Sequence, residues 1–234
     1  MTKLDKYDKQ ALSHAMDELW SLLSPEEQEM FFTHISVYRY RRNEMIYHEG
    51  ESPDYLLCLL SGKVKIYRDG YGGRSIINRV LRPVQYFGYR ASMAGEPYVT
   101  AAAAFEDSVV AWVPMNVVYR AMSKNNQLCA FFIRALSIDL GLADKRMVSL
   151  TQKHVRARLA ETLLTLSDIY GFAEDGVTLN SLITRENMAS FSNMTTSNAI
   201  RTLMSFAKEG LVDVDGRKIK LLDMDKIVTI SEQG

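Results

Sequence analysis

The chain has 234 residues, of which 47% are hydrophobic, and its 28 lysines and arginines are balanced by 28 aspartates and glutamates. A neutral chain of this length can bury one or two hydrophobic cores, but it has no overall basic charge that would indicate nonspecific nucleic-acid binding. No apolar run approaches the ~18 residues of a membrane helix and the N-terminus does not resemble a signal peptide, so we expect a soluble cytoplasmic protein with no membrane contact.

The N-terminal part is predicted to contain helices followed by a β-roll. Ser24, Pro25 and Glu27 form a helix start with proline at the first position and a capping box. From about residue 37 to residue 114, short apolar runs alternate with turn residues. Within this region, 55–60 and 63–67 are predicted to pair as a tight hairpin. Many short strands at regular spacing indicate a small barrel or roll.

Residues 116–150 are predicted to form one long helix whose apolar side is too wide for a single small roll to cover. Apolar positions recur along it at spacings of four and three. The alternative is that the helix packs only on the roll of its own chain, and we expect such packing for part of its length. A parallel helix from a second subunit is the natural partner for the rest. The sequence therefore predicts a homodimer whose contact includes Leu128, Phe132, Leu136, Leu140, Ala143 and Met147.

The segment 184–211 is predicted to be a helix-turn-helix. Thr184 is placed to cap the first helix, Asn193 and Met194 to make the turn, and Thr195 or Thr196 to cap the second helix. Apolar residues recur in the second helix at Ala199, Ile200, Leu203, Met204 and Phe206, and Gly210 stands where a left-handed C-cap is expected. A supporting helix is predicted upstream at 153–170.

A β-hairpin is predicted directly after the second helix. Residues 212–222 alternate apolar and polar side chains around Asp215-Gly216, which is the strongest short hairpin signal. A hairpin in this place is the wing of a winged helix-turn-helix, a form that inserts its second helix into the major groove of DNA.

Outward polar side chains of this region are predicted to contact double-stranded DNA, because they can bond base edges or phosphates. They are Arg185, Thr195, Thr196, Ser197, Asn198, Arg201, Arg217 and Lys218. Residues 151–234 nevertheless carry ten lysines and arginines against eleven aspartates and glutamates. The basic groups would have to gather on one face, and we expect moderate, salt-sensitive affinity. For the two helices alone, an ordinary helical hairpin is the alternative.

The order of these parts resembles the Crp/Fnr superfamily of bacterial transcription regulators. Local matches lie at 55–67, 86–88, 104–107, 158–164, 184–186 and 208–212. The resemblance implies an α+β fold with an N-terminal double-stranded β-helix, a jelly-roll-like sensor domain, at 1–115. It also implies a long dimerisation helix at 116–150 and a winged helix-turn-helix at 151–234. Such regulators bind an effector in the roll and recruit or block RNA polymerase, and a two-fold dimer fits a palindromic site.

The residues that hold a cyclic nucleotide in members of that superfamily are replaced here. Those members have a glutamate for the ribose after a Phe-Gly pair, then an arginine and a hydroxyl residue for the phosphate. In this chain Tyr89 follows Phe87-Gly88, while Tyr98 and Val99 stand at the arginine and hydroxyl positions. The phosphate thus loses its bidentate partner, and we do not expect a response to cyclic AMP. A different effector pocket is predicted from Tyr86, Gly88, Tyr89, Arg90, Tyr98 and Thr100. The alternative is that the tyrosines fill the roll and leave no effector.

No cofactor, metal or catalytic activity is predicted. Cys58 and Cys129 lie in apolar stretches and are expected to be buried thiols rather than a disulfide. No spacing of cysteine and histidine indicates zinc or an iron–sulfur cluster, and no nucleophile–base pair or phosphate loop indicates an enzyme. The alternatives are haem, with His34 or His48 as a ligand, or another small effector.

The second helix departs from the superfamily at its base-reading positions. Arg201 matches an arginine that contacts bases or phosphates, whereas Thr196 and Ser197 replace the arginine and glutamate that read G and C in the cyclic-AMP-responsive group. With Asn198 beside them, these residues favour a site containing A and T. From a different class, the chain could be a ligand-binding interaction module whose winged helix binds protein.

Overall fold

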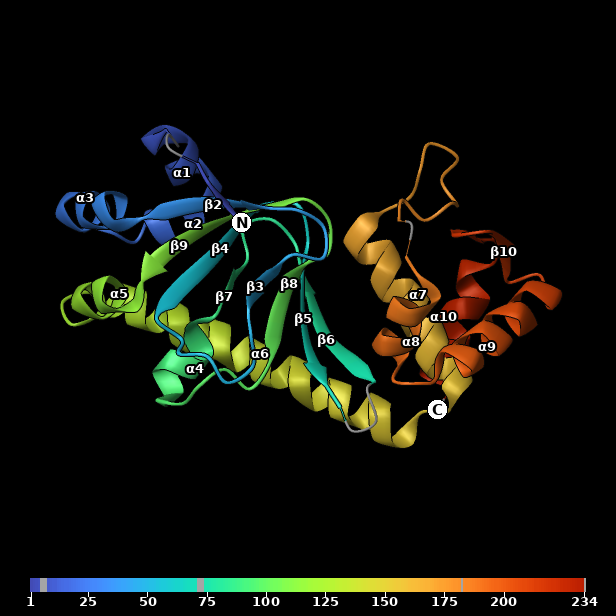
Figure 1. The fold of residues 1–234 in the computed structure, drawn as a ribbon. Coiled ribbons are helices and arrows are strands. Elements are labelled where there is room, and N and C mark those ends of the chain that lie inside the picture. Colours follow the sequence, from blue (N-terminus) through green and yellow to red (C-terminus); the bar gives the residue numbers. More distant parts are fainter. Residues whose placement is uncertain (5–7, 71–73, 182, 234) are drawn as a thin grey trace. The chain divides into compact units, whose positions relative to one another are not determined.

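The computed structural model describes residues 1–4, 8–70, 74–181 and 183–233 of the chain (Figure 1). The chain divides into two compact units, one made of residues 1–68 and 78–140 and the other of residues 69–77 and 141–234. The predicted α+β architecture, with a roll, a long helix and a helix-turn-helix, is confirmed.

Two antiparallel sheets form the roll, which belongs to the first unit except for residues 69–77. The five-stranded sheet has the order β1 (Thr2–Lys3), β2 (Ser36–Tyr40), β9 (Ser108–Pro114), β4 (Tyr55–Ser61) and β7 (Tyr86–Phe87). The four-stranded sheet has the order β3 (Met45–Tyr47), β8 (Ala101–Ala104), β5 (Val64–Asp69) and β6 (Ser75–Leu81). Residues of both sheets share one buried cluster, so the sheets pack face to face.

Strand β4 is apolar along its length because both of its faces are covered. Leu57 and Leu59 lie in the cluster between the sheets, whereas Leu56 and Cys58 lie in a second cluster formed with the helices. Alternate residues of a strand point to opposite faces, and this strand therefore needs apolar residues at successive positions.

The predicted hairpin of 55–60 and 63–67 is wrong. Strand β4 pairs with β7 and β9 of one sheet, while β5 pairs with β8 of the other. The chain changes sheets at Gly62, whose φ is +86° and whose position leaves only 2.3 Å between an added Cβ and the Asp107 carbonyl oxygen. Ser108 accepts a hydrogen bond from the Lys63 amide at 3.1 Å and holds this corner in place.

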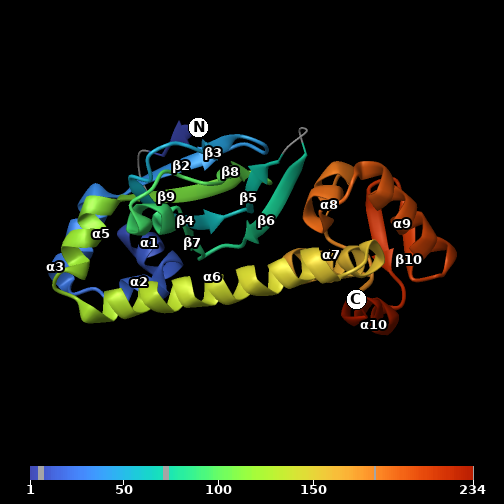
Figure 2. The same cartoon turned by 90° about the horizontal axis from the view of Figure 1, so that it is seen from below.

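Helices cover the outer face of the five-stranded sheet. They are α1 (Lys9–Ala15), α2 (Asp17–Trp20), α3 (Pro25–His34) and α5 (Met115–Met122), with the first turns of α6 (Asn126–Gln152) beside them; α4 (Tyr89–Ala94) follows β7. The capping box at Ser24 is confirmed, since Ser24 and Glu27 each bond the other's backbone. Figure 2 shows α6 as one continuous helix.

The single helix predicted over 116–150 is two helices, because Asn125 breaks it. The Asn125 side-chain oxygen accepts from the Leu128 amide at 3.0 Å and caps α6. Its amide nitrogen donates to the Leu22 carbonyl and to Glu27, at 2.8 and 2.9 Å. These partners lie about a hundred residues upstream in the chain.

The second unit contains α7 (Val155–Tyr170), α8 (Arg185–Ser192), α9 (Thr196–Lys208), the strands β10 (Val212–Asp215) and β11 (Lys218–Leu221), and α10 (Met224–Glu232). The sequence did not predict α10, which packs against α7 and buries Ile227. Asp223 caps it by accepting from the Lys226 amide. Among the described helices, none is long and apolar enough to cross a bilayer.

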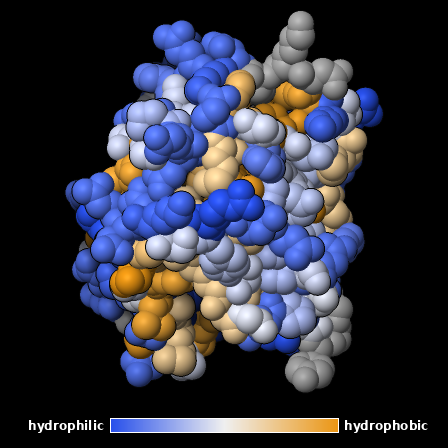
Figure 3. Space-filling view, turned by 90° about the vertical axis from the view of Figure 1, so that its left-hand side faces the viewer, coloured by the Kyte–Doolittle hydropathy of each residue, from blue (hydrophilic) through white to orange (hydrophobic). Residues whose placement is uncertain are grey.

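The face that carries α3 and α5 is largely hydrophilic, with apolar side chains gathered in small patches (Figure 3). Its polar character agrees with the exposed charged residues of α3, such as Glu26 and Glu29.

Candidate DNA-binding interface and sensor roll

Helices α8 and α9 form the predicted helix-turn-helix, and local side-chain bonds set both helix starts. The Thr184 hydroxyl accepts from the Asn187 amide at 3.1 Å, and the Thr195 hydroxyl accepts from the Asn198 amide at 3.2 Å. Such caps each stabilise a helix by ~1 kcal/mol. Asn193 makes the turn with a φ of +48°, a left-handed conformation that asparagine tolerates. The caps and the turn predicted from the sequence are confirmed.

One side of α9 is exposed along its whole length. Ala199, Leu203 and Phe206 are buried on the inner side. The exposed side carries Ser197, Ile200, Arg201, Met204 and Lys208. Thr196 and Asn198 are half-buried at the helix start, and Thr195 is exposed.

Ile200 and Met204 correct the sequence interpretation, which placed them with the inner apolar residues of α9. They are 42% and 47% exposed. At 100° per residue, Met204 lies about 40° and Arg201 about 100° around the helix from Ile200 in one direction, whereas Leu203 lies about 60° from Ile200 in the other direction. Apolar spacing alone did not separate the inner stripe from this outer pair.

Arg201 is exposed and forms no hydrogen bond or ion pair with any described residue. Its five N–H groups are therefore available to a ligand. The exposed Thr195 and Ser197 lie at the start of α9, where a helix leaves four backbone N–H groups without intrahelical partners, and the Thr195 hydroxyl occupies one of them, the Asn198 amide. This end of α9 can bind an anion such as a phosphate, while Arg201 one turn later can bind a base edge or a second phosphate.

The wing is the hairpin of β10 and β11, with Asp215 opposite Lys218 and Gly216 in the turn at a φ of +55°. Arg217 and Lys218 are exposed at its tip. Arg185, also predicted to contact DNA, donates from Nη2 to the Gly216 carbonyl at 2.6 Å, and burial lowers the pKa of its guanidinium. Arg185 thus ties the start of α8 to the wing turn.

An ion pair holds α9 against α7. Both terminal nitrogens of Arg156 donate to Glu209, at 2.8 and 2.6 Å, and the guanidinium lies 4.9 Å from the centre of the Phe206 ring. The hydrogen bonds from Arg156 and Ser205 lower the pKa of Glu209 to about 2. Since both charged groups are partly exposed, this pair orients the helix more than it stabilises the fold.

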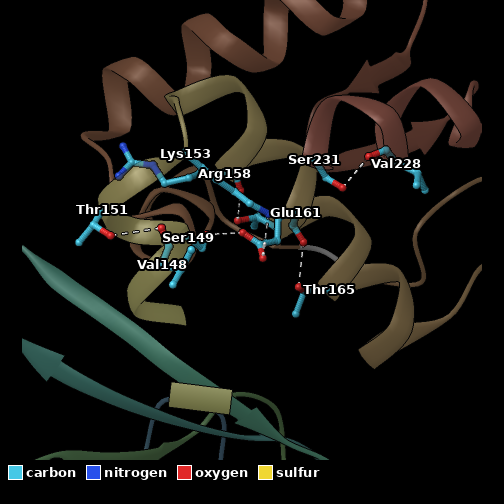
Figure 4. Close-up of polar contacts among 10 residues, drawn as sticks. Val148, Ser149, Thr151, Lys153, Arg158, Glu161, Thr165, Val228 and Ser231 are labelled. Atoms are coloured by element: carbon cyan, nitrogen blue, oxygen red, sulfur yellow. Dashed lines mark hydrogen bonds and ion pairs between the residues drawn. The ribbon is translucent and has the colours of Figure 1, made fainter. Parts of the chain in front are cut away.

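Glu161 joins the last turn of α6 to α7 (Figure 4). Its carboxylate accepts from the Ser149 hydroxyl and lies 3.6 Å from the Lys153 ammonium. Arg158 donates to the Leu150 carbonyl at 3.3 Å. Arg146 of α6 donates to the Phe191 carbonyl of α8. The end of α6 is therefore part of the second unit's own framework.

The tyrosines predicted to line an effector pocket fill the roll and its helical cover. Tyr86 is buried, donates to the Met16 carbonyl at 3.2 Å, and has its pKa raised by burial. Tyr89 is buried against the Phe132 ring, and burial raises the pKa of Tyr89 to about 12. Tyr98 is buried and stacks on Tyr47, with ring centroids 3.8 Å apart and planes 14° apart.

Gly88, Arg90 and Thr100, the other residues predicted for the effector pocket, have different surroundings. A Cβ on Gly88 would lie 3.2 Å from the Tyr98 hydroxyl, so this backbone already touches the tyrosine. Arg90 donates to Glu96 at 2.8 Å and is half-exposed. Thr100 is half-buried. The one arginine of this set is neutralised by a carboxylate.

The candidate haem ligands and the cysteines lie in different helices, strands and loops. His34 bonds the Met30 carbonyl at 2.8 Å, and His48 is exposed in the loop after β3. Cys58 is buried, which raises the pKa of its thiol to about 12, and Cys129 is half-buried. In the described ranges no three histidine, cysteine or acidic side chains group in a way that could hold a metal ion.

The predicted dimer helix has two different halves. Leu128 and Phe132 are buried in the core of the first unit, and Leu136 packs partly against it. Leu140 and Met147 are 64% and 60% exposed, and Ala143 is exposed between them. Ile133, which the sequence did not single out, is 65% exposed.

Part of the exposed apolar surface of α6 follows a heptad pattern, whereas Ile138 and Leu142, 55% and 52% exposed, fall outside it. Ile133, Leu140 and Met147 are seven residues apart, and Leu136 and Ala143 follow the first two by three. This is the a and d spacing of a two-stranded coiled coil.

Residues 37–125 match the family of cyclic nucleotide-binding domains, and residues 157–230 match the Crp-like helix-turn-helix domain family. The chain is 25% identical to a global nitrogen regulator from Nostoc sp. over 200 residues, which cover 84% of this chain and 88% of the relative. It is 22% identical to a CRP-like cAMP-activated global transcriptional regulator from Mycobacterium tuberculosis over 187 residues, which cover 80% and 84% of the two chains. A solved structure of a Crp/Fnr-family regulator from Eubacterium rectale is similar in fold, with a TM-score of 0.80 at 19% identity, covering 92% of this chain and 97% of that one.

Proposed function

Because the chain belongs to the Crp/Fnr family of DNA-binding transcription regulators, we propose that it acts as a homodimer on a palindromic site and does not respond to cyclic AMP. The roll at 1–115 is then the sensor, the helical region 116–150 holds the dimer together, and 151–234 binds DNA. As transcription regulators rather than enzymes, members of this family act by contacting DNA and RNA polymerase.

The exposed side of α9 is the observation that carries the proposal for DNA. Arg201 stands on it without a protein partner in the described chain, beside a capped helix start. Arg217 and Lys218 add positive charge at the wing tip, on the same small domain. In a unit with almost no net charge, these groups supply the local positive charge that phosphates need.

The exposed heptad positions of α6 support the dimer. Three large apolar side chains, Ile133, Leu140 and Met147, are each at least 60% exposed in the isolated chain. Pairing with the same positions of a second copy would bury them against their equivalents. Two recognition helices related by a two-fold axis would then contact half-sites ~34 Å apart.

The interior of the roll argues against cyclic AMP as the effector. A cyclic phosphate needs a donor that pairs with its oxygens, preferably a bidentate arginine. Tyr98 stands at that position and is stacked on Tyr47, while Arg90 is already paired with Glu96. One relative is named as cAMP-activated and another only as a global nitrogen regulator, so family membership does not identify the effector.

A mobility-shift assay with a random-sequence duplex library tests the DNA-binding function. We expect the dimer to select a palindromic site with a Kd near ~10⁻⁸ M, at the weak end of specific binding. If Arg217 and Lys218 of each protomer neutralise one phosphate apiece, the affinity falls by ~10²-fold between 50 and 200 mM salt. Failure of a clean dimer to select any sequence, at any salt concentration, would contradict the proposal.

Cyclic AMP at millimolar concentration is expected to change neither the melting temperature nor the DNA affinity. A ligand present at a hundred times its Kd adds ~2.7 kcal/mol of stability, which raises the melting temperature of a domain this size by several degrees. Differential scanning calorimetry with and without the nucleotide measures this directly. A rise of more than about 2 °C, or tighter DNA binding in its presence, would show that the roll binds cyclic AMP after all.

A further inference from the structure

Two large apolar side chains stand in the middle of the surface proposed to bind DNA. Ile200 and Met204 are 42% and 47% exposed and lie one turn apart on α9. Arg201 and Ser197 share this side of the helix, and all four are exposed. The inner side is already occupied by Ala199, Leu203 and Phe206, so these two side chains are not needed for the core.

Local helix stability does not explain Ile200. A β-branched isoleucine is a poorer helix former than alanine, lysine or glutamate, which the exposed side of a helix ordinarily carries. Exposed apolar residues next to a functional arginine instead indicate a surface that becomes covered. That surface is continuous with Arg201 and the capped start of α9, which fixes DNA as the molecule that covers it.

The major groove offers one apolar group to such side chains, the 5-methyl group of thymine. Four residues of helix span ~6 Å along the axis, and base pairs are 3.4 Å apart. Ile200 and Met204 can therefore reach methyl groups one or two base pairs apart, and the three rotatable bonds of methionine give it added reach. Arg201 lies between them along the helix axis and beside Met204 around it, and binds a neighbouring base edge or phosphate.

We propose that Ile200 and Met204 select thymine in each half-site by contact with its 5-methyl group. This inference rests on the proposed DNA-binding function and extends it from a docking mode to a chemical basis for sequence choice. This mode of base recognition differs from the one expected of Thr196 and Asn198. It uses apolar contacts from the middle of α9 rather than polar contacts from the start of the helix.

Replacing single thymines by uracil tests the proposal, because uracil pairs with adenine identically and lacks only the methyl group. The probe is the duplex that the wild-type dimer selects from a random library. Burying one methyl group changes affinity about fourfold, equivalent to ~0.8 kcal/mol. A symmetric substitution in both half-sites should therefore weaken wild-type binding by about fifteenfold at one or two thymine positions.

The variants Ile200→Ala and Met204→Ala should each remove the thymine–uracil difference at one of these positions. Alanine is the better helix former, so both variants are expected to fold, and circular dichroism checks this. Val228→Ala is the matched control, since Val228 is 38% exposed on α10 and outside the proposed interface. It should keep the full thymine–uracil difference.

Three results would overturn the proposal while leaving the DNA-binding function intact: a selected half-site without thymine, equal wild-type affinity for every uracil duplex, or an unchanged thymine–uracil ratio in both alanine variants. Absence of any selected sequence would overturn the DNA-binding function, and this inference with it. The two failures are thus distinguished by whether specific binding exists at all.

Discussion

The Arg201→Ala variant is expected to lose specific DNA binding by about 100-fold or more while remaining a folded dimer. A good bidentate contact between arginine and a base contributes ~1–3 kcal/mol of discrimination, and a symmetric dimer makes each contact twice. The side chain is exposed and has no ion pair or hydrogen bond in the described structure, so its removal breaks nothing inside the domain. Alanine also favours the helix.

The measurement is a titration of the selected duplex and of an unrelated duplex with the same protein preparations. Specific affinity should fall towards the nonspecific value, and the nonspecific value should change little. Arg120→Ala is the matched control, because Arg120 is an exposed arginine on α5, in the unit that does not contain the helix-turn-helix. Normal specific binding by Arg201→Ala would rule out α9 as the recognition helix.

The helix-turn-helix could be predicted from the sequence because its signals are local. Thr184 and Thr195 cap helices within three residues of themselves, and Asp215-Gly216 closes a hairpin between adjacent strands. None of these depends on a distant part of the chain. The outward position of Ile200 and Met204 was not predicted, because α9 has apolar residues on two neighbouring stripes. The spacing of apolar residues does not tell which stripe faces the core.

The roll was harder to predict because distant contacts shape it. Gly62 resembles a hairpin turn in the sequence, but its close contact with Asp107 sends the chain into the other sheet. Asn125 separates α5 from α6 through bonds to Leu22 and Glu27, which no local pattern reveals. The replacement of the residues that bind a cyclic nucleotide could be read directly from the sequence, whereas the stacking of Tyr98 on Tyr47 became visible only in the structure.

The Leu140→Glu variant is expected to convert the dimer into a monomer. Leu140 is 64% exposed and stands at the centre of the heptad positions, with Ile133 and Met147 seven residues to either side. At a two-fold coiled-coil contact the two new carboxylates would lie opposite each other in an apolar seam. Burying charges of the same sign without partners costs several kcal/mol, enough to raise the dissociation constant by more than 100-fold.

Sedimentation velocity at micromolar protein concentration measures the loss of the dimer, and circular dichroism checks that the monomer keeps its helices. Lys145→Glu is the matched control, because Lys145 is exposed on the same helix, roughly 140° around it from Leu140. Specific DNA affinity should fall when the dimer is lost, since each half-site then binds one protomer without the other.

A Leu140→Glu protein that stays dimeric would place the subunit contact elsewhere, and the apolar side of α6 would need another partner. If instead it becomes monomeric but keeps full affinity for the selected duplex, the palindromic mode of binding is wrong, although Arg201 could still be the residue that contacts the bases.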